Sequence, residues 1–584
     1  MSDGTRTFGT MRLIDAGANW EIAKLEPHVA IRFKQIFPRV PKNSAGPFKL
    51  PRDIMHAADL TWFTSRYPLA IRDDEAHALA HEKGLFDIQQ AELERILAPD
   101  YKAPSSIGLR EDQSLRRYQT QAIEVLRRRR SLLLGDEGGL GKTYVAAAFM
   151  ASEPGALPAA VVCDPHMQKQ WRDKTTAFTH LRVHVIKKGS PYNLPVADVY
   201  VFRVSQIKGW IDFFATGFFK AAIFDEPQSL RTGTSTAKGA AAKVLAQQAL
   251  WRLGLTATPI YNYGVEIWNV MQFIDDLALG SYHDFLREWG DDDGRVKDPK
   301  ALGAYLREQH VFLRRLKSDV GLQLPKVSRI VEYVEHDEKA VQSVEDLARK
   351  LAIRATTGSF VERGQAAREL DMMVRQATGI SKARSVAQFV RLLVDAGEPV
   401  LLLGWHREVY DIWLRDLADL NPAMYTGSES TAKKDAELQR FLDKQTNVLI
   451  MSLRSGAGLD GLQHRCSICV FGELDWSPGI HQQIIWRLDR DGQPLPVTAF
   501  FLVSGDGSDP PIMDVLGIKA SEAHQIVDPH MGMQSNVADT SNLKKLVERY
   551  LEKMRTRPAG APIHDAPEQQ PRDEQADLFA TEPS

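Results

Sequence analysis

Cysteine is scarce in this chain of 584 residues, which contains only three. Three cysteines are too few for a disulfide framework, and their scarcity fits a reducing cytosol. Cys466 and Cys469 form a CxxC pair in HRCSICVFG, but the sequence holds no second pair to complete a tetrahedral zinc site. We therefore expect both to be small buried residues of a strand.

Long apolar runs and a strong net charge are also missing. The sequence has no stretch of 18 consecutive apolar residues and no charged-then-apolar N-terminal signal, so we expect a soluble cytoplasmic protein without a membrane partner. The net charge is −2 and the pI about 6.8, so the bulk charge does not indicate a nucleic-acid partner. Local basic patches can still attract one, because a partner meets the local field.

The sequence does contain short apolar runs that alternate with helical stretches, in two separate regions. Examples are SLLLGDE and AAIFDEP in the first region, and NVLIMSL and VTAFFLV in the second. This alternation is typical of parallel sheets flanked by helices, so we expect an α/β protein with two such units in series. The expected parts are an accessory module (1–105), a first lobe (106–335), a charged helical linker (336–380), a second lobe (381–515), a helical extension (516–555) and a disordered tail (556–584).

The stretch GDEGGLGKTYVAAAFM, residues 135–150, has the features of a phosphate-binding loop. The apolar run at 131–134 predicts a buried strand, and the Ala-rich run after the loop predicts a helix whose N-terminus faces the phosphates. The glycines allow a tight turn and a close approach of backbone N–H groups to an anion. Lys142 would then reach the β- and γ-phosphates, and the Thr143 hydroxyl would bind Mg²⁺. Asp136, however, stands where the common pattern has glycine.

Two adjacent acids follow the apolar run AAIF, in AAIFDEPQ at residues 221–228. Asp225 at a strand end can hold Mg²⁺ through water, and Glu226 can orient and deprotonate an attacking water. Downstream, Thr256 and Thr258 flank a small residue in RLGLTATPIYN. We expect these threonines to form a polar turn that couples the acids to the neighbouring unit.

A third group of polar residues lies in the second unit, in DWSPGIHQQIIWRLDRDGQ at residues 475–493. Gln483, Arg487 and Arg490 have the spacing Q-x₃-R-x₂-R, which predicts that all three share one helical face. Two arginines on that face, directed across a cleft between the units, would stabilise charge on a transferring phosphoryl group.

Taken together, these motifs resemble those of the Swi/Snf-type ATPases of helicase superfamily 2, in the family's order from about Leu115 to Val503. DEGGLGKT corresponds to the family's DEMGLGKT, so Asp136 belongs to the family's own loop. VVCDPHMQKQW, DEPQ, LTATPIYN and FLRRLKSDVGLQLPK correspond to the CP-x₄-NW, DEAH, LTGTPIQN and LRRxKxDV…LPxK segments. The short insertions look more like the compact bacterial and phage branch, which is similar to annealing and fork-remodelling enzymes. The resemblance implies two tandem RecA-like lobes.

The resemblance also implies roles for individual residues. The ATP-binding residues would be Arg116, Gln119, Asp136, Gly138, Gly139, Gly141, Lys142 and Thr143, and the coupling residues Gln228, Thr256, Thr258 and Gly456. The residues that contact DNA phosphates would be His166, Lys169, Arg314, Arg315 and Lys317. Gln228 replaces the histidine of the family's second motif, so the strength of coupling between the lobes could differ.

The implied activity is ATP- and Mg²⁺-dependent translocation on double-stranded or forked DNA, in bacterial or phage replication, repair or fork remodelling. Three alternatives stay open: the motor subunit of a phage-defence or restriction assembly, an ATPase switch that is tethered to a sliding clamp and releases a partner, and a strand-separating helicase. The implied location is the nucleoid. Arg127–Arg130 would complete a helix, where cations suit the C-terminal dipole, or would line DNA; we favour the first interpretation.

The polar tail contains one short apolar motif, QADLF at residues 575–579. An extended peptide of this kind can place Leu578 and Phe579 in an apolar pocket, with Gln575 at its rim. Together with Asp577, these residues are similar to the bacterial sliding-clamp-binding pentapeptide, Q-x-[SD]-L-F. The tail therefore predicts binding to the sliding clamp.

Overall fold

A computed structural model describes residues 6–104, 108–258, 266–291, 295–322, 324–325, 327–342, 345–357, 360–453 and 459–514. Gly456, the expected helical extension and the tail with Gln575, Asp577, Leu578 and Phe579 lie outside these ranges. Within them, no helix has both the length and the apolar character needed to cross a membrane.

The N-terminal module is a small antiparallel sheet packed on helices. Strands β1 (Thr10–Ile14), β2 (Asn19–Ala23) and β3 (Phe48–Pro51) pair in that order, next to α1 (Pro27–Ile36) and α2 (Ile54–Arg66). Trp20, Phe33 and Phe63 are fully buried between sheet and helices. This aromatic core gives the module a hydrophobic centre of its own.

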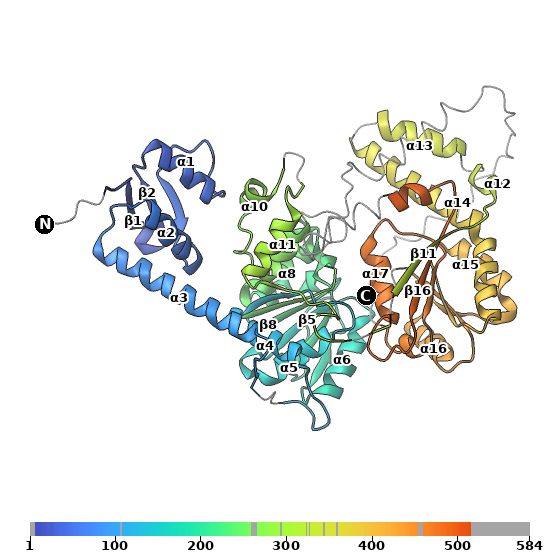
Figure 1. The fold of residues 1–584 in the computed structure, drawn as a ribbon. Coiled ribbons are helices and arrows are strands. Elements are labelled where there is room, and N and C mark those ends of the chain that lie inside the picture. The colour runs from blue at the N-terminus through green and yellow to red at the C-terminus, as the bar shows by residue number, and fades with distance from the viewer. Residues whose placement is uncertain are drawn as a thin grey trace.

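The module is attached to the first lobe at two places. Helix α3 (Asp73–Leu97) runs from the module to the lobe (Figure 1), where Leu93 and Ile96 join the lobe's core. The second attachment is Arg39, which donates hydrogen bonds to Glu288 (2.9 Å) and to the carbonyl of Ala278 (2.9 Å).

The first lobe is a seven-stranded, fully parallel sheet in the order β10-β4-β9-β8-β5-β7-β6. Its strands are β4 (Ser131–Leu134), β5 (Ala159–Cys163), β6 (Val183–Val185), β7 (Val199–Arg203), β8 (Ala221–Asp225), β9 (Trp251–Leu255) and β10 (Phe312–Leu313). Its helices are α4 (Arg117–Arg129), α5 (Lys142–Ser152), α6 (Met167–Phe178), α7 (Ile211–Phe214), α8 (Ala237–Gln248), α9 (Glu266–Ile274), α10 (Tyr282–Trp289) and α11 (Pro299–Glu308). Two apolar cores pack on this sheet, which explains why its central strands are continuous apolar runs.

The second lobe is a six-stranded parallel sheet in the order β11-β16-β15-β12-β14-β13. Its strands are β11 (Val327–Tyr333), β12 (Val400–Gly404), β13 (Ala423–Tyr425), β14 (Val448–Ser452), β15 (Ile468–Phe471) and β16 (Val497–Val503). Its helices are α12 (Glu338–Gln342), α13 (Glu345–Thr357), α14 (Phe360–Asp395), α15 (Arg407–Asp416), α16 (Thr431–Leu442) and α17 (Pro478–Leu488). The prediction of two tandem α/β lobes with parallel sheets is confirmed.

Strand β11 lies in the second sheet, although the sequence analysis placed residues 327–333 in the first lobe. It pairs with β16 along its whole length, as the outermost strand of the sheet. Ile330 and Val331 of this strand remain exposed, because an edge strand is covered less than a central one. A strand with little burial carries a weak apolar pattern, and nothing in it says which sheet it joins.

The arginine run ends helix α4 and is held by contacts within the protein. Arg128 pairs with Glu92 of α3, and Arg129 pairs with Asp275 at 3.2 Å. Arg130 follows the helix in a left-handed conformation, with φ of +62°. The favoured interpretation of this run as a helix end is therefore confirmed. The three cysteines are buried and unpaired, and Cys469 lies in β15 as expected, whereas Cys466 precedes that strand.

Candidate nucleotide site between the two lobes

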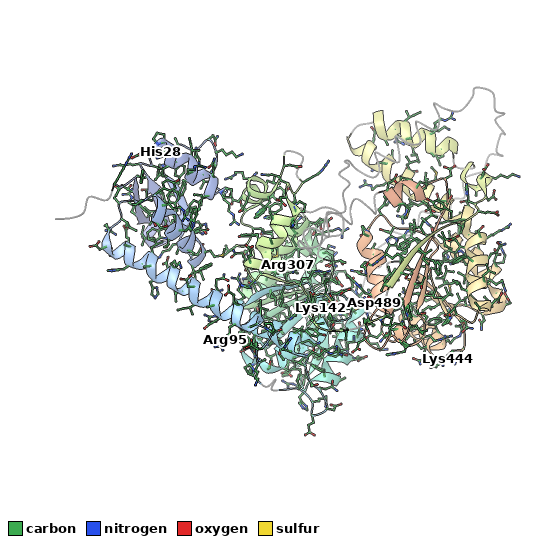
Figure 2. The ribbon with its side chains drawn as sticks, viewed as in Figure 1. His28, Arg95, Lys142, Arg307, Lys444 and Asp489 are labelled. Atoms are coloured by element: carbon green, nitrogen blue, oxygen red, sulfur yellow. The ribbon has the colours of Figure 1, made fainter. Side chains whose placement is uncertain are left out.

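A cleft of about 660 Å³ lies between the lobes and is lined by both. The predicted site residues that line it are Arg116, Gln119, Gly138, Gly139, Gly141, Lys142, Thr143, Asp225, Glu226, Gln483, Arg487 and Arg490. Figure 2 shows Lys142 of the first lobe close to the junction with the second lobe. Residues that are more than 300 positions apart in sequence thus meet in one cavity.

The loop between β4 and α5 has the conformation expected of a phosphate-binding loop. Gly139 and Gly141 have φ of +92° and +77°, a region that favours glycine, and α5 begins at Lys142. A Cβ atom at Gly138 would lie 2.5 Å from the Trp486 side chain of α17. This glycine is therefore required for the close approach of the second lobe as well as for an anion.

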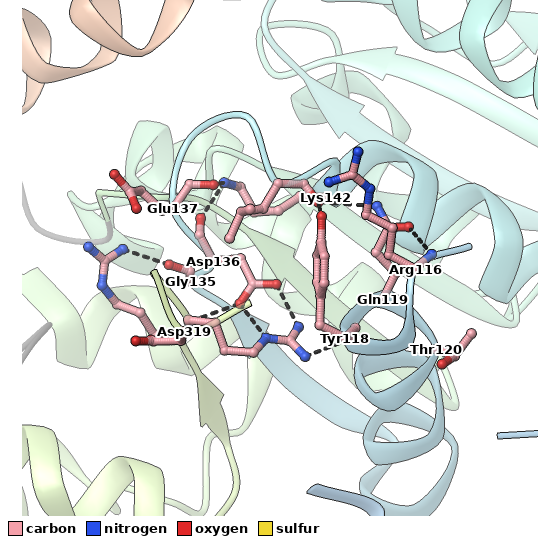
Figure 3. Close-up of polar contacts among 12 residues, drawn as sticks. Arg116, Tyr118, Gln119, Thr120, Gly135, Asp136, Glu137, Lys142 and Asp319 are labelled. Atoms are coloured by element: carbon pink, nitrogen blue, oxygen red, sulfur yellow. Dashed lines mark hydrogen bonds and ion pairs between the residues drawn. The ribbon is translucent and has the colours of Figure 1, made fainter. Parts of the chain in front are cut away.

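Lys142 lies at the centre of this loop (Figure 3). Its ammonium donates hydrogen bonds to the carbonyls of Asp136 (2.5 Å) and Glu137 (3.3 Å). Burial lowers the pKa of Lys142 to about 8, against the opposing effect of Glu226 and Asp136. The charge is thus desolvated and held beside the acids, where a phosphate would be stabilised strongly.

Asp136 has a different place from the one the sequence predicted, since it lines no part of the cleft. It is fully buried and accepts hydrogen bonds from the Arg315 guanidinium at 2.6 and 3.0 Å and from the Arg315 backbone N–H at 3.0 Å. The carboxylate therefore ties the loop to the chain that follows β10. The prediction that Asp136 contacts ATP is therefore corrected.

Three of the predicted DNA contacts are also corrected. Arg315 forms an ion pair with Asp136. Arg314 is buried and donates to the carbonyl of Gly135 at 2.7 Å. Lys317 is buried against Asp489 of the second lobe, with 2.6 Å between Nζ and Oδ2. These cations neutralise polar groups at the ends of strands and at the lobe junction, so they do not face DNA in this conformation.

The two acids end the central strand β8. Asp225 accepts a hydrogen bond of 2.7 Å from Nε1–H of Trp171 in helix α6. Burial raises the pKa of Asp225 to about 7, with the neighbouring Glu226 charge adding to this rise. Glu226 has φ of +52° and accepts a hydrogen bond from the Gln228 side chain. Gln228 therefore lies where it can orient the candidate base.

Trp171 is a site residue that the sequence analysis missed. It lies within VVCDPHMQKQW, from which the resemblance implied only His166 and Lys169 as site residues, both in contact with DNA. Strands β5 and β8 are neighbours in the sheet, so helix α6, which follows β5, places this indole beside the end of β8. Only the order of the strands reveals that contact.

The donors around Asp225 fit a divalent cation. Asp225 and Thr143 supply a carboxylate and a hydroxyl to the same cleft, and both are hard oxygen ligands. Within the described ranges, no group of three or more His, Cys, Asp or Glu residues could hold a metal ion by itself. This donor set suits Mg²⁺, which usually binds through one or two carboxylates together with substrate phosphates.

A polar contact joins the expected coupling turn to the second lobe. The Gln483 side chain donates to the Thr258 hydroxyl at 3.0 Å, and the Thr258 backbone N–H donates to the Thr256 hydroxyl at 3.0 Å. The prediction that Arg490 shares a helical face with Gln483 and Arg487 is wrong, because α17 ends at Leu488 and Arg490 lies in the turn beyond it. The helix ends because Asp489, its C-cap, has left the helical region of the backbone, with φ of −83° and ψ of 75°.

Arg487 and Arg490 have different surroundings. Burial lowers the pKa of Arg487 to about 10, and among the described residues its Nε has no hydrogen-bond partner. Arg490 donates from one nitrogen to Asp460 at 2.5 Å and from another to the carbonyl of Trp486 at 3.1 Å. Arg487 thus keeps donor capacity in the cleft, where the charges of Glu226 and Asp225 act on it.

Arg116 and Gln119, which the resemblance assigns to ATP binding, both line the cleft. The Gln119 side chain accepts from the Arg116 backbone N–H (2.9 Å) and donates to the carbonyl of Leu140 (3.2 Å), which fixes the amide against the phosphate loop. Arg116 also pairs with Asp491 of the second lobe at 2.5 Å.

His166 and Lys169 are exposed, unlike the other predicted DNA contacts. Both lie at the start of α6, and Lys169 pairs with Asp435 of the second lobe at 2.9 Å. An exposed pair of this kind contributes little to stability. Their contact with DNA stays a prediction.

Comparison with known proteins is consistent with these motifs. The sequence profile of the SNF2-related domain matches residues 118–380. A Xenopus tropicalis SWI/SNF-related matrix-associated actin-dependent regulator of chromatin subfamily A-like protein 1 is 25% identical over 395 residues, 65% of this chain and 41% of that protein. An uncharacterized ATP-dependent helicase of Mycoplasma genitalium is 20% identical over 445 residues, 71% of this chain and 42% of that protein.

The chain thus spans less than half the length of these two relatives. Among solved structures, the Sulfolobus solfataricus SWI2/SNF2 ATPase core in complex with dsDNA is 19% identical, covers 78% of this chain and 98% of its own, and superposes with a TM-score of 0.36. The motifs meet in one cleft and residues 118–380 match the SNF2-related domain, so the chain is similar to the Swi/Snf-type ATPases of helicase superfamily 2.

Proposed function

We propose that this protein hydrolyses ATP with Mg²⁺ and uses the energy to move along double-stranded or forked DNA. The observation that carries the proposal is the cleft between the lobes, where Lys142, Glu226 and Arg487 converge from both sides. The SNF2-related domain and the helicase relatives support DNA as the partner. A bacterial or phage setting and a role in replication, repair or fork remodelling are part of the proposal.

Each residue would have a distinct task in hydrolysis. Lys142 binds the outer phosphates, and Glu226, oriented by Gln228, accepts a proton from the attacking water. Arg487 stabilises the charge that develops on the transferring group. Thr143 and Asp225 would hold Mg²⁺, which neutralises phosphate charge when bound.

The decisive experiment is ATP hydrolysis by the wild type and by Glu226→Gln, each without DNA, with single strands, with duplex and with forked DNA. We expect duplex or forked DNA to stimulate the wild type, and Glu226→Gln to lose at least about 100-fold in kcat. Glu92→Gln removes an acid that pairs with Arg128 away from the cleft, and is the matched control. Equal rates with and without any DNA would remove the translocase proposal and favour a nucleotide-driven switch.

Binding to the sliding clamp is a separate proposal that depends on the tail alone. We expect Leu578→Ala combined with Phe579→Ala to abolish binding of the full chain to a bacterial clamp in a direct binding assay, with ATP hydrolysis unchanged. Absence of clamp binding by the wild-type chain would refute this proposal without affecting the motor.

A further inference from the structure

Asp460 of the second lobe is the point at which three polar side chains from both lobes meet. One carboxylate oxygen accepts a hydrogen bond from Gln170 (2.7 Å) and contacts the Lys174 ammonium (2.5 Å), both on helix α6 of the first lobe. The other oxygen accepts from the Arg490 guanidinium at 2.5 Å. Lys174 and Arg490 lower the pKa of Asp460 although burial opposes them, so the carboxylate is held in its charged form.

The position of Arg490 makes this junction relevant to the nucleotide. A Cβ atom at Gly139 of the phosphate loop would lie 2.9 Å from the Arg490 Cβ, so the two backbones are in close contact. The guanidinium nevertheless binds Asp460 and the carbonyl of Trp486, within its own lobe. Its charge is therefore matched by a carboxylate, whereas the buried Arg487 has no such partner on its Nε among the described residues.

Helix α6 supplies the residues of the first lobe that contact Asp460. Gln170 and Lys174 are four residues apart, so they lie on the same face of α6 and approach Asp460 together. The same helix carries Trp171, the donor to Asp225. A displacement of the second lobe at Asp460 would thus act on the helix that orients the metal-binding acid.

From this arrangement we propose that Asp460 is a positioning residue for ATP hydrolysis. It holds Arg490 beside the phosphate loop and binds the second lobe to α6. Arg487 then stabilises the charge on the phosphoryl group. The inference rests on the proposed ATPase activity, because it divides the work of the two arginines in that reaction. It makes Asp460 and Arg490 one functional unit.

The test is a double-mutant cycle in the full chain, with kcat and KM for ATP measured at saturating duplex DNA. We expect Asp460→Asn and Arg490→Gln each to lower kcat roughly 10- to 100-fold, because a misplaced group of this kind costs that much, with KM within about threefold of the wild type. The kcat of the double variant should be no lower than that of the less active single variant, since the effects of residues that act as one unit are not additive. Asp460→Glu, which keeps the charge, should recover most of the activity.

Two controls separate this role from a purely structural one. Asp435→Asn removes another carboxylate that pairs with α6 but does not contact an arginine of the site, and should keep wild-type kcat. Thermal melting of each variant reports folding. A wild-type kcat in Asp460→Asn, or losses that multiply in the double variant, would overturn the inference alone. A wild type without ATP hydrolysis would overturn the proposed function and the inference with it.

Discussion

The pKa values and orientations of single residues in this cleft depend on neighbours that lie far away in the sequence. Asp225 is the clearest case, because burial and Glu226 raise its pKa to about 7 while the Trp171 hydrogen bond lowers it. Near neutral pH the carboxyl is therefore balanced between its protonated form and the charged form that Mg²⁺ requires. A proton and the metal ion compete for the same oxygens.

At this scale we predict the effect of Trp171→Phe on the pH profile of ATP hydrolysis. Loss of the N–H donor removes an interaction that favours the charged carboxylate, so the pKa of Asp225 rises. Since the charged form is the active one, the acid limb of the profile should move to higher pH, and the requirement for Mg²⁺ should increase. An unchanged acid limb would show that Asp225 does not set it.

The matched control is Trp210→Phe. This substitution also removes an indole hydrogen bond, to the carbonyl of Lys188 at 3.2 Å, in a fully buried tryptophan of the same lobe. Both variants should lose about 1 kcal/mol of stability. Only Trp171→Phe should shift the pH profile.

Among the secondary-structure elements, α17 and the phosphate loop are shaped for each other. Trp486 lies against the backbone of Gly138, at a distance that leaves no room for a side chain. Glycine is therefore needed at this position for the docking of a helix from the other lobe, in addition to the requirements of a phosphate loop.

For this pair of elements we predict that Gly138→Ala abolishes most ATP hydrolysis, because the added methyl group pushes α17 away. Combination with Trp486→Ala should restore part of the activity, since it returns the space. Failure of this rescue would mean that the glycine serves the phosphates only. Gly84→Ala on α3, where a Cβ would meet nothing within 4 Å, is the control and should stabilise the chain by about 1 kcal/mol.

On the scale of the whole molecule, Arg39 supplies the second attachment of the N-terminal module to the first lobe, in addition to helix α3. Its guanidinium is desolvated, yet the pKa is raised because Glu288 and Tyr305 oppose the effect of burial. Arg39→Ala would leave Glu288 without this partner and should loosen the docking of the module, which α3 still connects to the lobe. We predict faster limited proteolysis between module and lobe, and a loss of about 2 kcal/mol in stability.

Arg52→Ala is the control for that experiment, because Arg52 pairs with Glu82 at 2.5 Å without reaching the lobe. Equal proteolysis of the two variants and the wild type would show that α3 alone holds the module in place. The ATP hydrolysis of Arg39→Ala then tells whether docking of the module influences the motor.

The sheets, the phosphate loop and the acid pair could be predicted because each depends on a local pattern. The sequence analysis failed where a residue's partner lies far away in the chain. Arg315 and Lys317 look like DNA contacts until the fold brings Asp136 and Asp489 to them. Trp171 could not be assigned because its role follows from which strands are neighbours.

Helix α3 has one consequence for how the protein meets a substrate. Its 25 residues correspond to about 37 Å, and its last turn is part of the core of the first lobe. A duplex of that length holds about eleven base pairs at 3.4 Å each. The helix therefore separates the module from the core of the first lobe by a length close to one turn of duplex DNA.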